Sequence, residues 1–80
     1  MERSKILEEI NAIFIDTLDN KDVVITDATQ ASDVEEWDSL THIQLVVAIE
    51  KHFKIRFTAK EIQSWNNVGE MINSIEGKLK

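Results

Sequence analysis

The sequence predicts an all-α fold, a small bundle of three main helices plus one short helix, with a long loop between the first two. Apolar residues recur at helical spacing in three separate segments. Residues that favour helix starts, Asp38 and Thr58, stand at the beginning of two expected helices. The 80 residues include two glycines and no proline, which argues against a β fold built on many tight turns.

The first helix is expected over residues 4–18, where charged residues separate apolar ones at helical spacing. These apolar residues are Ile6, Leu7, Ile10, Ile13, Phe14 and Leu18. Residues 19–38 show no clear period, so we predict a long loop there. We expect four apolar residues of this loop to pin it to the core: Val23, Val24, Ile25 and Trp37. A loop of about twenty residues is unusual in a compact domain and is often functional.

The second helix is expected over residues 39–53, with Asp38 as its N-cap. It carries two apolar stripes. The first begins beside His42 and contains Leu45, Val46, Ile49 and Phe53. The second contains Leu40, Ile43 and Val47. One stripe is enough to bury a helix against a core, so the second stripe either contacts another helix or forms an exposed recognition face.

Residues 53–57 alternate between apolar and polar, but a single strand of five residues has no partner to pair with. We therefore expect an extended link that inserts Ile55 and Phe57 into the core. Thr58 and Glu61 form a capping box for a short helix over residues 58–65. Asn66 or Asn67 can cap a last helix over residues 67–79. Its expected core residues are Val68, Met71, Ile72, Ile75 and Leu79. Residues 1–80 would form a single domain.

The charge is concentrated before the second helix. The net charge is −6, and residues 16–38 contain eight acids and one base. A nucleic-acid binder needs clustered Lys and Arg, so we expect no nucleic-acid partner. The acids, Glu35, Glu36 and Asp38 among them, form either a solvated loop or a docking surface for basic partners. No signal peptide or apolar span is visible, so we expect a cytoplasmic monomer that does not insert into membranes.

The residue types exclude most catalytic chemistry. Without cysteine the chain has no disulfide, no thiolate metal site and no thiol nucleophile. His42 and His52 lie about 15 Å apart along one helix, too far to share a metal. Ser39 and His42 could form a pair, but we expect a domain of this size to offer no pocket or oxyanion hole. We therefore predict neither an enzyme nor a metal site.

Ser39 is the most informative residue. At the start of a helix its hydroxyl is expected to be exposed, and the free backbone amides there favour a phosphate ester on that oxygen. The alternative is that Ser39 only assists helix capping.

The segment EWDSL from Glu36 to Leu40, with the apolar pattern that follows it to Phe53, resembles the signature of acyl carrier proteins. The resemblance extends over essentially the whole chain. It implies that phosphopantetheine, donated by coenzyme A through a phosphopantetheinyl transferase, is attached to Ser39. The arm would hold acyl groups as thioesters for a loading enzyme and for later enzymes of fatty-acid, polyketide or related biosynthesis. It also implies that Asp38 and the second stripe, Leu40, Ile43 and Val47, contact these partners.

Two departures bear on the subtype. The resemblance to fatty-acid carriers is weaker in charge. Those carriers usually have a strongly acidic second helix, whereas residues 39–53 are nearly neutral here. The tryptophan before Asp38 is more similar to carriers of secondary metabolism or of D-alanyl transfer. We favour a freestanding, specialised carrier of acyl groups. The alternatives are an aminoacyl, peptidyl or D-alanyl carrier, and a helical interaction module that carries nothing.

Overall fold

The computed structural model describes residues 2–79 and confirms the predicted all-α fold. The helices are α1 (Arg3–Leu18), η1 (Ala31–Asp33), α2 (Ser39–Phe53), α3 (Ala59–Ser64) and α4 (Val68–Leu79). No strand forms within the described residues. The bounds lie within one residue of the predicted ones. The 3-10 helix η1 is an addition, because residues 19–38 were expected to be loop throughout.

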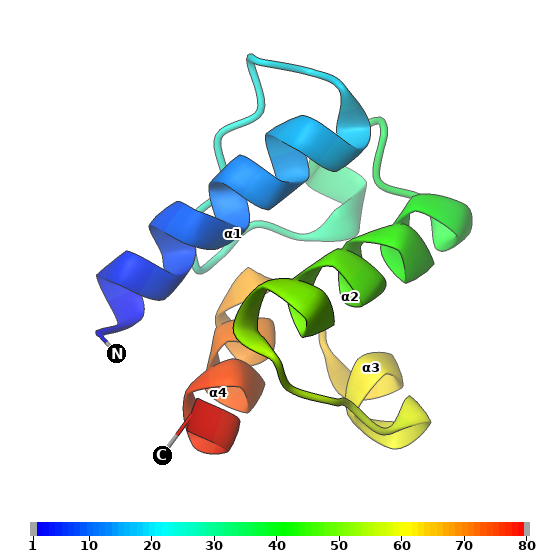
Figure 1. The fold of residues 1–80 in the computed structure, drawn as a ribbon. Helices are drawn as coiled ribbons and strands as arrows, with labels where there is room; N and C mark the ends of the chain where they lie inside the picture. Colours follow the sequence, from blue (N-terminus) through cyan, green and yellow to red (C-terminus); the bar gives the residue numbers. More distant parts are fainter. Residues whose placement is uncertain (1, 80) are drawn as a thin grey trace.

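Helix α1 packs against both α2 and α4, while α3 is a short helix beside α2 (Figure 1). The core between these helices is built from side chains with no exposed surface: Ile6, Ile10, Phe14, Leu45, Ile49, Val68, Met71, Ile72 and Ile75. All of them belong to the apolar stripes predicted from helical spacing. No helix within residues 2–79 has both the length and the apolarity to cross a membrane.

The long loop crosses α1 and is held to the core at three points. Val23, Ile25 and Trp37 are buried, as expected, and the Asn11 side chain accepts a 2.8 Å hydrogen bond from the Ile25 amide. The prediction for Val24 is wrong, because its side chain is 77% exposed. Adjacent side chains of an extended segment point to opposite sides, so burial of Val23 and Ile25 turns Val24 outward.

A second junction joins this loop to the start of α4. The amides of Val68 and Gly69 donate to the carbonyl oxygens of Thr29 and Asp27, at 2.9 and 2.8 Å. These amides would otherwise lack partners at the helix start. A Cβ atom at Gly69 would lie 3.0 Å from the Asp27 oxygen, so the close approach depends on glycine. Arg3 also reaches Asp27, at 3.4 Å.

The link between α2 and α3 behaves as predicted. Ile55 and Phe57 are partly buried against the core, and the predicted Thr58–Glu61 capping box is present. Helix α4 is capped by Asn67, whose side-chain oxygen accepts from the Glu70 amide at 2.9 Å.

Candidate functional site

The site begins at the start of α2, where Asp38 and Thr41 cap the helix reciprocally. The Asp38 carboxylate accepts from the Thr41 amide at 2.9 Å, and the Asp38 amide donates to Thr41 Oγ1 at 2.8 Å. The hydrogen bond from the Thr41 amide lowers the pKa of Asp38, because it stabilises the ionised form. Asp38 was predicted as the cap, whereas the role of Thr41 was missed. Its signal is a hydroxyl three residues after the cap, where Glu or Gln is usual.

Ser39 is the first residue of α2 and is exposed. The cap is made by Asp38 and Thr41, so Ser39 is not needed for it. The positive end of the helix dipole also lies here, and it stabilises a negative group attached nearby. An exposed hydroxyl at this position therefore fits a phosphodiester.

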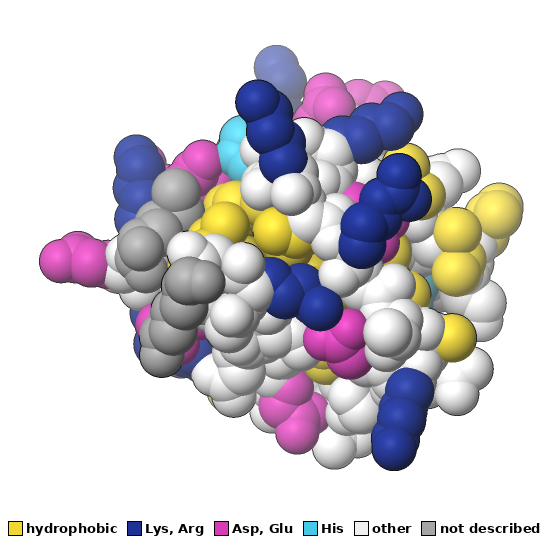
Figure 2. Space-filling model, turned by 60° about the horizontal axis from the view of Figure 1, so that its bottom comes forward, with side chains coloured by type: hydrophobic (Ala, Val, Ile, Leu, Met, Phe, Trp, Pro, Cys, Tyr) yellow, Lys and Arg dark blue, Asp and Glu magenta, His cyan; other side chains and the backbone are white. Residues whose placement is uncertain are grey.

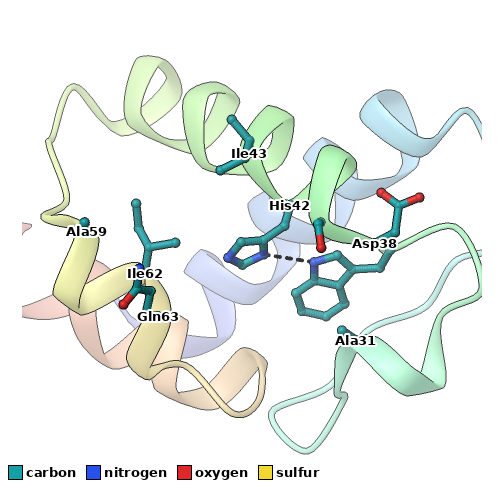
Figure 3. Close-up of a pocket in the computed structure, with 9 residues that line it drawn as sticks. Ala31, Asp38, His42, Ile43, Ala59, Ile62 and Gln63 are labelled. Carbon is teal, nitrogen blue, oxygen red and sulfur yellow. Dashed lines mark hydrogen bonds between the residues drawn. The ribbon is translucent and has the colours of Figure 1, made fainter.

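An open groove adjoins Ser39, between the start of α2, the helix η1 and the helix α3 (Figure 3). Its walls are largely apolar and include Ile43 from α2 together with Ala59 and Ile62 from α3. The expectation that this domain offers no pocket is therefore wrong. Small side chains at Ala31 and Ala59 leave the space open. No local pattern in the sequence indicates the groove, because its walls come from elements far apart in the chain.

Two rings that line this groove, Trp37 and His42, belong to a longer row of aromatic side chains. Trp37 stacks on His42 with ring centroids 6.0 Å apart, and His42 meets Trp65 edge to face at the same distance. Trp65 in turn meets Phe57 at 4.9 Å, and Phe14 meets Trp37 at 5.0 Å. Trp37 was expected only to pin the loop, and the part played by Trp65 was missed. The row connects α1, the end of the long loop, α2 and the residues that flank α3.

His42 is held in this row by a hydrogen bond. The Trp37 indole Nε1 donates to His42 Nδ1 at 3.0 Å, drawn as the dashed line in Figure 3. Burial lowers the pKa of His42, and the Ile62 backbone partly offsets that shift. Nδ1 already accepts the hydrogen bond from Trp37, so its lone pair is not available to accept a proton from Ser39. A Ser39–His42 catalytic pair is not supported through this nitrogen.

The second apolar stripe of α2 is exposed. Leu40 is 68%, Ile43 56% and Val47 42% exposed. The sequence left open whether this stripe contacts another helix or forms an exposed face, and the structure shows an exposed face. The first stripe lies in the core, as predicted, with Leu45, Val46 and Ile49 buried and Phe53 partly buried.

The acidic residues before α2 differ in solvent exposure and in hydrogen bonding. Glu35 and Asp38 are exposed. Glu36 is half-buried and accepts a 2.8 Å hydrogen bond from the Asn20 side chain. His52 lies at the other end of α2, where its Nε2 is 2.7 Å from Glu9. The two histidines are thus in separate surroundings, and the described residues contain no cluster of three or more potential metal ligands.

Comparisons with known proteins agree with this geometry. A family described as "Phosphopantetheine attachment site" matches residues 8–75. The acyl carrier protein of Thermosynechococcus vestitus is 30% identical over 80 residues, covering 99% of this chain and 98% of that protein. The acyl carrier protein of Coprothermobacter proteolyticus is 29% identical over 79 residues, with 99% and 96% covered.

The fold has a solved counterpart. The solution NMR structure of a holo acyl carrier protein from Geobacter metallireducens is similar to this chain with a TM-score of 0.86 and 38% sequence identity. The similarity covers 91% of this chain and 84% of that protein.

Proposed function

This chain belongs to the acyl carrier protein family, and on that premise we propose that Ser39 is the residue to which its phosphopantetheine is attached. One observation carries the assignment: Ser39 is exposed at the first position of α2 while Asp38 and Thr41 make the cap. The hydroxyl is therefore accessible to an enzyme and is not needed to hold the helix together.

The chain is a carrier and not an enzyme. The covalently bound phosphopantetheine supplies a terminal thiol that holds an acyl group as a thioester. The residues of the chain position this arm. The helix start stabilises the charge of its phosphodiester, and the apolar groove beside Ser39 offers a surface against which the arm can lie.

We further propose which residues face the partner enzymes. As a family member the chain works with enzymes such as transferases and synthases. Leu40, Ile43 and Val47 would give them an apolar contact next to Ser39, because all three are exposed. The acids before Ser39 would add attraction for a basic partner surface: Glu35, Glu36 and Asp38. Of these acids Glu36 contributes least, because Asn20 already binds it.

For the cargo we propose acyl intermediates of a specialised biosynthetic pathway, handled by a cytoplasmic monomer in which residues 1–80 form one carrier domain. The near-neutral charge of α2 supports a specialised carrier over one for fatty-acid synthesis. An aminoacyl, peptidyl or D-alanyl carrier is the second candidate, favoured by Trp37 in front of Asp38 and Ser39. A helical module that carries nothing does not agree with the family membership.

The attachment is tested by incubating the protein with coenzyme A and a broad-specificity phosphopantetheinyl transferase, then measuring its intact mass. The wild type and Ser32→Ala should each gain one phosphopantetheine, and Ser39→Ala should gain none. Ser32 is a matched control because it is also an exposed serine, in η1. A gain that persists in Ser39→Ala would refute the assignment.

The cargo is tested on the modified protein. Loading by an acyltransferase with acyl coenzyme A would support the acyl carrier, whereas loading only by an adenylating ligase with an amino acid would support the second candidate.

A further inference from the structure

Four exposed side chains form one row along α2: Ser39, Ile43, Val47 and Lys51. Side chains four residues apart lie one above the other on a helix, so these four make a continuous ridge. The ridge begins at the proposed attachment residue, passes two apolar side chains and ends at a cation. Its two ends lie about 18 Å apart along the helix axis.

The far end of this row is a cationic hollow. Lys51, Lys54 and Arg56 line it together with Val47 and Glu50, and the three cations are exposed. They stand in residues 51–60, which contain four bases and no acid. Figure 2 turns the link between α2 and α3 toward the reader and shows several Lys and Arg side chains projecting from this side.

None of these three cations forms an ion pair within residues 2–79, although Lys51 also borders a second hollow with Glu9 and Asp16. Glu50 lines the same hollow as the three cations and accepts a 2.8 Å hydrogen bond from the Phe57 amide, so three cations there face one carboxylate. The ion pairs formed within residues 2–79 use Arg3, His52 and Lys78 as their basic members. The hollow therefore keeps a net positive charge that an external carboxylate can neutralise.

The surface that includes Ser39 is thus bipolar. Glu35 and Asp38 are exposed at its start, apolar side chains lie in the middle, and cations end it. An interface of ordinary size covers about 800 Å² on each partner, which corresponds to a patch about 30 Å across. An enzyme that reaches Ser39 by lying along α2 would therefore cover both charged ends.

We propose that the phosphopantetheinyl transferase that modifies Ser39 docks along this row and presents carboxylates to Lys51, Lys54 and Arg56. The inference rests on the proposed attachment at Ser39. It is carried by charge complementarity, since only an acidic region of the partner matches the far end while its active site faces Ser39. A second copy of the chain, packed antiparallel, would also match the charges. However, three exposed apolar side chains offer little area for a stable dimer.

The test uses the organism's own phosphopantetheinyl transferase with the wild type, Lys51→Glu, Arg56→Glu and Lys5→Glu. Each variant makes the net charge more negative by the same amount, and all three positions are exposed. Lys5 lies in the first turn of α1 and lines neither the hollow nor the groove beside Ser39, so it serves as the matched control. Thermal unfolding establishes that the variants are folded. Initial rates at several salt concentrations then give KM and kcat, and sedimentation gives the oligomeric state.

We expect KM to rise about fivefold for Lys51→Glu and Arg56→Glu at low salt, with kcat unchanged and Lys5→Glu equal to the wild type. Salt screens charges, so it should raise the KM of the wild type and reduce the difference in KM between the wild type and the two variants. Equal KM values for Lys5→Glu, Lys51→Glu and Arg56→Glu would overturn the inference while leaving the attachment intact. A wild-type dimer that Lys51→Glu dissociates would overturn it in favour of self-association. Absence of modification in the wild type would refute the attachment itself, and the inference with it.

Discussion

Trp37 donates a 3.0 Å hydrogen bond from its indole Nε1 to Nδ1 of His42, and the two rings stack with their centroids 6.0 Å apart. This contact ties the end of the long loop to the first turns of α2. Ser39 lies between the two residues in sequence. The same contact therefore helps to fix the position of Ser39 at the junction of the loop and α2.

The contact predicts that acid weakens the fold. An indole N–H can only donate, so the hydrogen bond requires an unprotonated Nδ1. Burial lowers the pKa of His42 in the folded protein below its ordinary 6.5. The unfolded chain therefore binds the proton more readily, and stability present above pH 6.5 is lost as the pH falls toward the folded pKa. Thermal unfolding across this range measures the loss.

The control for this prediction is His42→Phe, which keeps a ring in the aromatic row but cannot titrate. Its melting temperature should depend less on pH than that of the wild type between pH 6.5 and the folded pKa of His42. Parallel pH profiles for the two proteins would contradict the role given to His42.

The cap of α2 makes a second prediction. Asp38→Ala should lower the melting temperature, because the Thr41 amide loses its acceptor, whereas Asp38→Asn keeps an acceptor and should lower it less. The pKa of Asp38 is lowered, so the contribution of its charge is present above its ordinary pKa of 3.8 and is lost as the pH falls below it. Ser39→Ala should leave the melting temperature unchanged. A large drop for Ser39→Ala would show that Ser39 is part of the cap.

The two glycines of α4 give a matched pair for the third prediction. Gly69→Ala should destabilise the protein by about 1–3 kcal/mol, because its Cβ would lie 3.0 Å from the Asp27 oxygen. Gly77→Ala should stabilise it by about 1 kcal/mol, since a Cβ there meets nothing within 4 Å. Denaturant unfolding measures both. Equal changes in the free energy of unfolding for the two variants would mean that close approach of the loop to Gly69 does not contribute to stability.

The exposed stripe of α2 gives a fourth prediction. Ile43→Asp and Val47→Asp should leave the free energy of unfolding nearly unchanged, because both side chains are exposed, while slowing transfer of phosphopantetheine. The comparison variant Ile49→Ala removes a fully buried side chain and should cost about 2–5 kcal/mol. A similar loss of stability for Ile43→Asp would place that residue in the core.

Local features of the sequence were enough to predict the four α-helices, though not the 3-10 helix η1. Asp38 and Thr58 act through atoms three residues away, so their caps can be read directly from the chain. Helical spacing likewise identified the buried stripe of α2, including Leu45 and Ile49. For the exposed stripe, spacing alone could not separate a helix contact from an open face.

Features that depend on contacts between distant segments could not be predicted in this way. The groove needs Ala31 and Ala59 to meet near Ser39, and nothing in their own surroundings indicates that meeting. The exposure of Val24 follows from the side on which Val23 and Ile25 are buried, which is a tertiary choice. Ser39 was singled out by its place at the helix start and by resemblance, whereas the reciprocal Asp38–Thr41 cap that leaves it free became visible only in the structure.

Attachment of phosphopantetheine to Ser39 underlies every functional proposal made for this chain. The most direct measurement is fragmentation mass spectrometry of the digested protein after incubation with coenzyme A and a phosphopantetheinyl transferase. We predict that the added mass lies on Ser39 alone. Location of the added mass on Thr41 or Ser32, or its absence from every peptide, would show that Ser39 is not the attachment residue.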